Sequence, residues 1–483
     1  MNEILNNKET KRFYGEHFTP IELFKEYIFP WIKDNINEYV WIDLYAGEGN
    51  LILPILDYIE PEKKIEFFKN NIYMFEIQKE NFDKLLLNTM AKGIPEDIAK
   101  KNIFLNDTIK NYPIKFLKKF QKPVFHITNP PYLYLGYIVK NKERFKTNFE
   151  YFNDKSNEGY QDLYQLALIN DLRNKIYKMI YIIPSNFLFG ASVSNKIRKD
   201  FFQYYTMNKA IIFEKEIFEF TGTNVVVCNF TRKNETNKKD IIFNGVKINC
   251  KTVEKKYILK YKNSYRAGNE LSDFLDLYTQ NEKIKFSFYL EEKTIINGNK
   301  IIDLLDANKF ENGQYVKTER KVNDLIYNTI KNNILFIRTV DTGSQDGRAG
   351  LYITKQIFDC DGILVTKSKF RTHPIQIFFE ENILIDEQKI IKDYFNLILE
   401  YLREITDSEF MTSYKYSNSE YVRKYLGLTQ AKKILETYPI KLSPKMKVRF
   451  SKLITEKNAN KVLDFLNTNC IGEKSNQLEL SFN

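Results

Sequence analysis

Short apolar runs, each ending at a polar or turn residue, recur through the first half of the chain. Longer stretches with apolar residues at helical spacing separate several of them, as over residues 20–35 and 161–176. Strands that alternate with helices favour a parallel, doubly wound sheet covered by helices on both faces, and so an α/β fold. The runs that we expect to form its strands are residues 39–45, 71–77, 102–107, 124–128 and 178–184.

The next two apolar runs, residues 209–218 and 223–233, have no helix-like stretch between them. We expect them to form an antiparallel hairpin at one edge of the sheet. Residues 231–240 are strongly polar and mark the expected end of the first domain. We therefore predict three parts: a first domain over residues 1–240, a second domain of mixed α+β structure over residues 241–470, and a polar tail over residues 471–483.

The chain has 483 residues, which is enough for two domains with cores of their own. Its formal net charge of +11 suits a polyanion such as nucleic acid, although a solvated lysine-rich surface explains that charge equally well. The four cysteines lie far apart without a CxxC pair, so we expect neither a metal site nor a disulfide framework. We find no signal-peptide pattern and no apolar run of membrane length, and we expect a monomeric cytoplasmic protein.

Glycines and acidic side chains follow the first three predicted strands. Gly47 and Gly49 come after Asp43 at the end of the first strand, Glu76 ends the second, and Asp107 follows the third. Ligands bind at the carboxyl ends of the strands in doubly wound sheets, and glycine lets a backbone approach a ligand closely. Each carboxylate alone fits an ordinary solvated side chain, but together they describe a nucleoside pocket. The pattern lacks the third glycine of the dinucleotide fingerprint and the lysine of a P-loop.

The fourth predicted strand ends at Asn129-Pro130-Pro131-Tyr132. Two consecutive prolines cannot lie inside a helix or a central strand, so this segment is rigid and extended. Here the chain resembles the gamma class of S-adenosylmethionine-dependent DNA adenine-N6 methyltransferases. The resemblance rests on motifs in a fixed order: HFTP at 17–20, DLYAGEGN at 43–50, FEI at 75–77, ND at 106–107, NPPY at 129–132, DLYQLAL at 162–168, YIIPSNFLFG at 181–190 and EIFEFTGTNVVVCNF at 216–230.

The resemblance implies a Rossmann-like catalytic domain that uses S-adenosylmethionine, followed by a domain that recognises a target sequence in duplex DNA. It implies that Asn129, Pro130 and Tyr132 are catalytic, and that Tyr132 and Phe218 stack on the two faces of the target base. Leu44 departs from the family, which usually has proline after the acid of the cofactor loop. The cofactor-binding residues that the resemblance implies are Thr19, Pro20, Asp43, Tyr45, Gly47, Gly49, Glu76, Ile77, Asp107 and Asn129.

An adenine amino group is a poor nucleophile because its lone pair is delocalised into the ring. The Asn129 side-chain oxygen and the Pro130 carbonyl can accept hydrogen bonds from both amino hydrogens, which favours a lone pair directed at the methyl donor. The transfer itself then needs no general base. His126 lies inside an apolar strand, and we interpret it as a core histidine rather than as a base.

An adenine inside a duplex cannot reach such a pocket, so the enzyme would flip it out of the helix. Residues 241–470 would then recognise the DNA sequence. Each candidate for this role also fits an ordinary surface residue. The candidates are Arg338, Arg348 and Arg371 for base edges or phosphates, and Lys445, Lys447 and Arg449 for the DNA backbone.

Two other functions stay open on the sequence: a methyltransferase for glutamine side chains of proteins, which meets the same lone-pair problem, and a non-catalytic DNA-binding module. We expect an adenine-specific enzyme of a restriction–modification system, associated with the nucleoid. A separate restriction endonuclease would recognise the same DNA sequence without binding the methyltransferase directly. The tail resembles peptides that dock on the DNA sliding clamp, although packing on its own domain explains its apolar residues better. The clamp-like pattern comprises Gln477, Leu478, Leu480 and Phe482.

Overall fold

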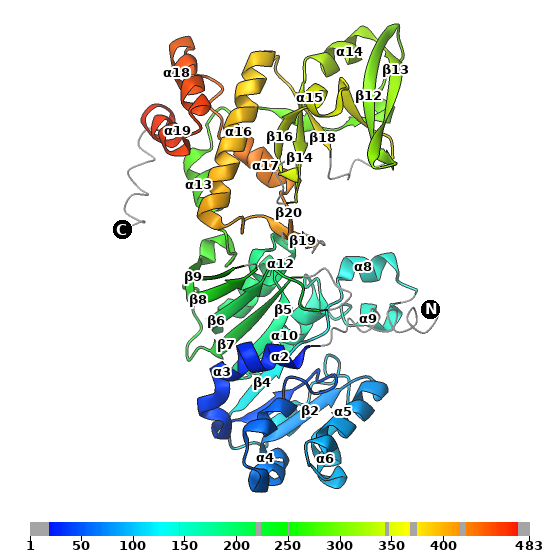
Figure 1. Cartoon of the computed structure of the whole chain (residues 1–483), viewed down its shortest axis with the longest axis vertical. Coiled ribbons are helices and arrows are strands. Elements are labelled where there is room, and N and C mark those ends of the chain that lie inside the picture. Colours follow the sequence, from blue (N-terminus) through cyan, green and yellow to red (C-terminus); the bar gives the residue numbers. More distant parts are fainter. Residues whose placement is uncertain are drawn as a thin grey trace. The chain divides into compact units, whose positions relative to one another are not determined.

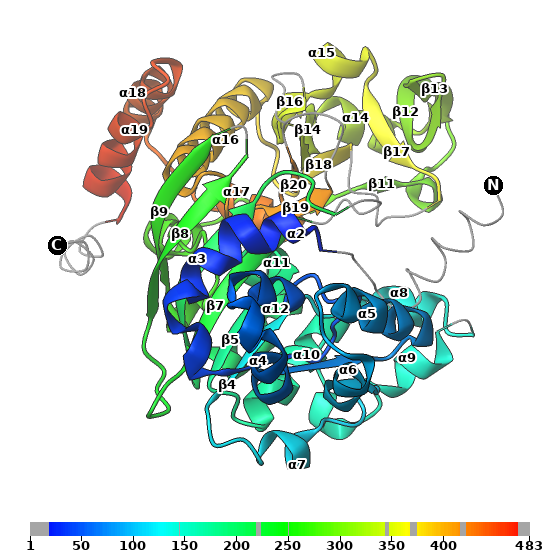
Figure 2. The ribbon, with the colours of Figure 1, turned by 60° about the horizontal axis from the view of Figure 1, so that its bottom comes forward.

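The computed structural model describes residues 19–143, 145–218, 224–249, 251–342, 347–367, 374–415 and 422–471. The chain divides into two compact units, whose elements are labelled in Figure 1 and seen from a second direction in Figure 2. Unit 1 comprises Met1–Ala267 with Lys415–Val422, and unit 2 comprises Gly268–Tyr414 with Arg423–Asn483.

Unit 1 is built on one nine-stranded sheet with the strand order β3-β2-β1-β4-β5-β7-β6-β8-β9. Strands β1 to β5 pair in parallel, while β7 runs antiparallel to both β5 and β6. The predicted α/β class with a mostly parallel, Rossmann-like sheet is thus confirmed. The strands are β1 (Val40–Asp43), β2 (Ile72–Glu76), β3 (Ile103–Leu105), β4 (Val124–Thr128), β5 (Lys178–Pro184), β6 (Tyr205–Phe213), β7 (Val225–Arg232), β8 (Ile241–Ile248) and β9 (Thr252–Leu259).

The predicted antiparallel hairpin forms as β6 and β7, which pair from Tyr205↔Arg232 to Ile212↔Val226. It does not form an edge of the sheet, because β8 pairs in parallel with β6 and β9 pairs antiparallel with β8. The polar residues 231–240 therefore belong largely to the connection between two strands of one sheet. The division between the compact units comes after Ala267 rather than near residue 240.

The central strands of this sheet are buried on both faces. The side chains of Trp41, Ile42, Ile127, Ile180 and Ile182 are all inaccessible to solvent. Strands of this kind need helices on both faces, which is why apolar runs alternate with helical stretches in the sequence. The α-helices of unit 1 are α2 (Ile21–Leu23), α3 (Phe29–Ile32), α4 (Lys64–Asn71), α5 (Lys79–Ala91), α6 (Glu96–Asn102), α7 (Ile114–Leu117), α8 (Leu135–Lys140), α9 (Lys146–Glu150), α10 (Leu163–Arg173), α11 (Asn186–Phe189) and α12 (Ser192–Phe202).

Unit 2 contains three smaller sheets with the orders β10-β18-β14-β16, β11-β17-β12-β13 and β15-β20-β19. Its strands are β10 (Phe286–Phe288), β11 (Leu290–Glu291), β12 (Lys300–Glu311), β13 (Gln314–Val322), β14 (Leu335–Arg338), β15 (Val340–Asp341), β16 (Gly350–Ile353), β17 (Gly362–Val365), β18 (Ile375–Phe379), β19 (Thr412–Lys415) and β20 (Arg423–Tyr425). Its α-helices are α13 (Glu270–Tyr278), α14 (Asp324–Lys331), α15 (Thr354–Phe358), α16 (Ile385–Thr406), α17 (Leu428–Leu435), α18 (Pro444–Thr455) and α19 (Ala459–Leu466).

Helix α16 is the centre of the larger core of unit 2. Its residues Ile391, Tyr394, Ile398 and Leu402 recur at helical spacing and are fully buried. Across the described ranges no helix is long and apolar enough to cross a membrane. The described residues also contain no group of three or more His, Cys, Asp or Glu side chains arranged to hold a metal ion.

Candidate active site

A pocket lies in unit 1, beside the carboxyl ends of β1 to β4. Of the predicted cofactor residues, only Pro20 and Gly49 do not line it. The predicted residues along its wall are Thr19, Asp43, Tyr45, Gly47, Glu76, Ile77, Asp107 and Asn129.

The loop after β1 is held by Asp43. Its Oδ1 atom accepts hydrogen bonds from the Tyr45 amide at 2.9 Å and from the Thr128 hydroxyl at 2.6 Å. The carboxyl is almost fully buried, and burial raises its pKa to about 6. Asp43 therefore connects the ends of β1 and β4 and fixes the first turn of the loop.

The two glycines of this loop serve different purposes. Gly47 has a φ of +55°, and a Cβ atom there would meet nothing within 4 Å, so its backbone leaves open space at the pocket wall. Gly49 has a φ of +89°, and a Cβ atom there would lie 2.6 Å from a methyl group of Leu85 and 2.7 Å from one of Leu53. Gly49 is thus required by packing behind the loop rather than by the pocket.

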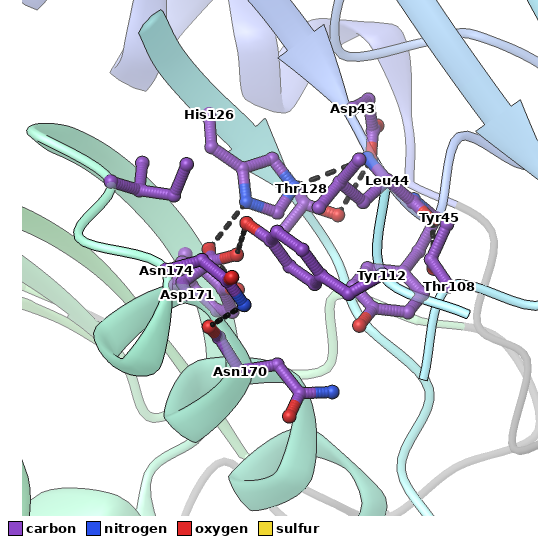
Figure 3. A network of polar contacts seen from close by, with 12 residues as sticks. Asp43, Leu44, Tyr45, Thr108, Tyr112, His126, Thr128, Asn170, Asp171 and Asn174 are labelled. Carbon is purple, nitrogen blue, oxygen red and sulfur yellow. Dashed lines mark hydrogen bonds and ion pairs between the residues drawn. The ribbon is translucent and has the colours of Figure 1, made fainter. Parts of the chain in front are cut away.

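The amide of Leu44 donates a hydrogen bond to His126 Nε2 at 3.1 Å. Because Nε2 accepts, the proton of the imidazole lies on Nδ1, which donates to Asp171 Oδ2 at 2.6 Å. Figure 3 shows His126 between the loop and helix α10, with Tyr112 donating to the other oxygen of Asp171 at 2.8 Å. Both ring nitrogens are occupied, so the prediction that His126 is a core residue is confirmed.

This network explains how the chain accommodates Leu44. A proline at this position would have no N–H group, whereas leucine brings a buried donor that needs a partner. His126 supplies the acceptor, and Asp171 fixes the required tautomer of the ring. The sequence pattern did not identify Asp171, since it lies 45 residues from His126 and just beyond the DLYQLAL motif on helix α10.

Glu76 ends β2 with its carboxylate at the pocket. Its Oε2 atom accepts from the Gly47 amide at 2.9 Å, and its Oε1 atom accepts from the Gln78 amide at 2.7 Å. A carboxylate offers about four acceptor positions. These two bonds orient the group at the pocket wall. The neighbouring Ile77 side chain is 41% exposed and lines the same wall as an apolar surface.

Asp107 lies on the pocket wall beyond β3. Its Oδ2 atom accepts from the Tyr151 hydroxyl at 2.8 Å, and its Oδ1 atom accepts from the Lys110 amide at 3.2 Å. Tyr151 and Asn148 line the pocket as well, although they come from the segment of α9, well after the NPPY motif. Sequence reasoning missed both residues, because no local pattern distinguishes them from the other tyrosines and asparagines of that segment.

Asn129 lies at the end of β4 between two hydroxyl groups. Its Nδ2 atom donates to Thr19 Oγ1 at 3.0 Å, and its Oδ1 atom accepts from the Tyr132 hydroxyl. The same Tyr132 hydroxyl lies 2.7 Å from the carbonyl of Ile182 on β5. The Thr19 carbonyl accepts in turn from Asn50 Nδ2 at 2.9 Å. The catalytic amide predicted from the sequence is therefore attached to the cofactor loop through Thr19, and Asn50 is a further pocket residue that the sequence analysis did not single out.

The two aromatic residues predicted to stack on a target base are both buried. Tyr132 is 8% exposed and Phe218 is 2% exposed, and both belong to the core of unit 1. Tyr132 also makes an edge contact with Tyr164, with a distance of 6.4 Å between the ring centroids. Their role in stacking stays a prediction, and it requires that each ring gain access to the base.

Asp162 anchors the segment that follows NPPY. Its Oδ1 atom accepts from the Leu133 amide at 2.9 Å and from the Tyr164 amide at 3.4 Å, so it also caps the start of α10. Burial raises the pKa of this carboxyl to about 7. The first residue of the DLYQLAL motif is therefore structural, and it keeps the backbone after the two prolines in place.

Unit 2 carries five of the six predicted DNA-contacting residues within the described ranges; Arg371 lies outside them, as does the clamp-like pattern of residues 477–482. The Arg338 guanidinium lies over the Tyr352 ring at 4.7 Å, and Arg348 lies 3.8 Å from Glu400. Because Arg338 ends β14 opposite Gly350, both arginines lie at one end of the β14–β16 pair. The others lie on α18: Lys445 and Arg449, which are exposed, and Lys447, which pairs with Glu387 at 3.2 Å.

A protein-family model described as N-6 DNA Methylase matches residues 3–324 of the chain. No curated protein sequence matches the chain. Among solved structures, the Type IIL restriction-modification enzyme MmeI in complex with DNA matches at 12% identity with a TM-score of 0.50, over 92% of this chain and 71% of that one. At this identity the likeness concerns the fold.

Two other solved structures are less similar. A modification subunit of a putative type I restriction enzyme from Vibrio vulnificus YJ016 matches at 14% identity with a TM-score of 0.37, over 72% of this chain and 61% of that one. A DrdV–DNA complex matches at 13% identity with a TM-score of 0.40, over 54% of this chain and 32% of that one. The chain therefore spans between about one third and three fifths of these two proteins.

Proposed function

Because the chain belongs to the N-6 DNA methylase family, we propose that it transfers a methyl group from S-adenosylmethionine to the 6-amino group of adenine in a specific duplex DNA sequence. The observation that carries the proposal is the position of Asn129, whose side-chain amide lines the wall of a nucleoside-type pocket at the end of β4. We place the enzyme in a restriction–modification system, in keeping with the fold likeness to MmeI over 92% of this chain.

The residues of the pocket fit S-adenosylmethionine. Glu76 offers acceptor positions that suit the two hydroxyl groups of a ribose, and Asp107 offers an acceptor for an adenine amino group. Ile77 supplies an apolar surface for the adenine ring, and Gly47 leaves room beside the loop. When bound, the cofactor supplies an electrophilic methyl group on sulfur.

The residues of the NPPY motif would prepare the nucleophile. The Asn129 side-chain oxygen and the Pro130 carbonyl would each accept one hydrogen of the adenine amino group. These bonds withdraw the lone pair from conjugation with the ring and strengthen as the nitrogen becomes tetrahedral, so they stabilise the transition state more than the ground state. The two prolines keep the backbone fixed, so that little reorganisation accompanies the reaction.

The target adenine would have to leave the duplex. Stacking on an aromatic side chain compensates part of the cost of unstacking and is worth about 1–3 kcal/mol per base. Tyr132 and Phe218 are the candidates for this role. Unit 2 would supply sequence recognition, through Arg338 and Arg348 at one end of the β14–β16 pair and through the basic helix α18.

The product of the reaction tests this proposal directly. The intact chain is incubated with methyl-labelled S-adenosylmethionine and either unmethylated genomic DNA or a protein extract, and the products are digested and identified by mass spectrometry. We expect N6-methyladenine in the DNA and no label in protein. Label at cytosine, label in glutamine side chains, or no transfer at all would contradict the proposed activity. Mapping the methylated positions then gives the recognition sequence for the experiments below.

A further inference from the structure

Thr19 contacts the cofactor pocket and the catalytic amide at the same time. Its side chain is 7% exposed and lines the pocket, and its Oγ1 atom accepts a hydrogen bond from Asn129 Nδ2 at 3.0 Å. Its backbone carbonyl is held by Asn50 Nδ2 at 2.9 Å, and Asn50 belongs to the loop after β1. The position of the threonine is therefore set by the cofactor loop, while its hydroxyl touches the group that would bind the target base.

The hydroxyl of Thr19 has one hydrogen to donate and two lone pairs that accept. One lone pair is used by Asn129, so the hydrogen must point elsewhere. Within the described part of the chain no side chain or backbone oxygen accepts it, and the pocket lies beside it. The Thr19 hydroxyl would donate this hydrogen to an acceptor bound in the pocket, such as the carboxylate of the amino-acid part of the cofactor.

The opposite end of the Asn129 amide is also held by a hydroxyl. Tyr132 has a single hydroxyl hydrogen and lies next to two acceptors, Asn129 Oδ1 and the carbonyl of Ile182. The hydrogen can therefore pass to Ile182 when Asn129 Oδ1 is needed for the amino group of a base. The Thr19 hydroxyl holds the other end of the amide, and loss of this contact would remove a hydrogen bond that keeps the Asn129 NH₂ group away from the base.

We propose that Thr19 couples occupation of the cofactor pocket to the orientation of the Asn129 amide. A carboxylate in the pocket accepts the Thr19 hydrogen, which directs an Oγ1 lone pair at Asn129 Nδ2 and holds Asn129 Oδ1 toward the target base. The inference rests on the proposed function, and it makes Thr19 a positioning residue in addition to a cofactor contact. Because coupling between two sites is reciprocal, a bound target base also tightens the cofactor.

The Asn129 side-chain amide reports this coupling without any DNA. In protein labelled with ¹⁵N-asparagine, its NH₂ signal is identified as the one lost in Asn129→Ala. S-adenosylhomocysteine, which cannot transfer a methyl group, should shift this signal in the wild type and in Thr19→Ser. In Thr19→Val the shift should be clearly smaller than in the wild type and in Thr19→Ser at saturating S-adenosylhomocysteine, with binding confirmed by calorimetry; the part that remains is the direct effect of the ligand on Asn129, which lines the pocket. An unchanged shift in Thr19→Val would overturn the inference, whatever the enzyme methylates.

The kinetic readout separates positioning from simple cofactor binding. At saturating S-adenosylmethionine, Thr19→Val should lower kcat roughly tenfold, the effect expected from one neutral hydrogen bond, while Thr19→Ser stays within about threefold of the wild type. Thr89→Val is the matched control, since it removes a buried hydroxyl of α5 that donates to the Leu85 carbonyl outside the pocket. A rise in KM for the cofactor with normal kcat would reduce Thr19 to a cofactor contact. If Thr19→Val does not fold, Thr19→Ala takes its place.

Discussion

The polar groups of the pocket in unit 1 and the exposed cations of helix α18 in unit 2 are held in different ways. Glu76 and Asp43 lie at strand ends with their oxygens bonded to backbone amides, so their positions follow from the sheet. Lys445 and Arg449 project from an exposed helix face, where Lys445 can adopt many conformations and Arg449 lies over the Phe465 ring at 5.8 Å. The pocket groups are thus positioned before a ligand arrives, whereas the DNA contacts predicted for α18 could adapt to the partner. Six substitutions, from the largest expected effect to the smallest, test how far this difference extends.

His126→Leu should have the largest effect, because it removes the centre of the hydrogen-bond network behind the pocket and so lowers the free energy of unfolding. It leaves the Leu44 amide without an acceptor and removes a hydrogen-bond donor from buried Asp171, and each buried group left unsatisfied costs about 1–3 kcal/mol. Urea titrations, which give the free energy of unfolding, measure this loss of stability. In a Leu44→Pro background the missing N–H removes one of the two orphaned groups, so the cost of His126→Leu should be smaller there. Equal costs in both backgrounds would refute the pairing of Leu44 with His126.

Asn129→Ala should lower kcat by about 100-fold to 1,000-fold, the range for removing one hydrogen-bonding group that acts in the transition state. Affinity for the cofactor and for DNA should change little, because the pocket wall keeps its other groups. Methyl transfer under saturating conditions is the measurement. Asn70→Ala, which removes an exposed amide bonded to Glu66 on α4, should leave kcat unchanged. Near-normal turnover of Asn129→Ala would contradict the role of the NPPY motif.

Glu76→Gln should weaken cofactor binding roughly tenfold to hundredfold, since its NH₂ group would face the amide of Gly47 or Gln78 and leave a buried donor without an acceptor. The dissociation constant of S-adenosylhomocysteine by calorimetry measures this loss, and kcat at saturating cofactor should be nearly normal. Glu80→Gln, on the exposed surface of α5, is the control. Equal affinity in both variants would remove Glu76 from the cofactor site.

Asp162→Asn should change how stability depends on pH. The folded protein keeps a proton on Asp162 up to a pKa of about 7, whereas the unfolded chain loses it near the ordinary value of 3.8. Unfolding therefore releases a proton in this window, and stability falls as the pH rises, by up to about 1.4 kcal/mol per pH unit. The variant keeps the acceptor oxygen and should lose part of this slope between pH 5 and 8. Asp43, with a pKa of about 6, should maintain the rest.

The control for this pH experiment is Asp154→Asn. Asp154 accepts a hydrogen bond from the Ser156 amide, which lowers the pKa of its carboxyl. Its contribution to folding stability is therefore lost only when the pH falls below the ordinary pKa of an aspartate. The free energy of unfolding of this variant should show the wild-type slope between pH 5 and 8. Slopes that are identical in the wild type and in Asp162→Asn would show that the buried carboxyl is already ionised in the folded protein at pH 5.

Lys445→Ala and Arg449→Ala should have the smallest effects. If each side chain contacts one phosphate, each substitution should lower the slope of log affinity against log salt by about 1 and weaken DNA binding equally for all sequences. Fluorescence anisotropy with a labelled duplex at several salt concentrations provides the slopes. Lys101→Ala, on the exposed surface of α6 in unit 1, should keep the wild-type slope. A change in sequence preference would show that α18 contacts base edges.

The pattern of the sequence determined most of the frame of unit 1. The five apolar runs predicted as strands became β1 to β5, because strands buried on both faces need continuous apolar residues. The carboxyl ends of parallel strands meet at one edge of a sheet, so Asp43, Glu76, Asp107 and Asn129 were expected near one another from their positions alone.

Tertiary structure alone decided the contacts between distant segments. Nothing in the sequence near Leu44 indicates that His126 accepts its amide hydrogen, and nothing near Asp107 indicates that Tyr151 bonds to it on the pocket wall. The position of β7 between β5 and β6 also depends on pairing energies over the whole sheet. The periodicity of hydrophobic and polar residues shows which face of one segment is buried. Pairings across 44 to 82 residues depend on how all segments pack together, which local sequence patterns do not encode.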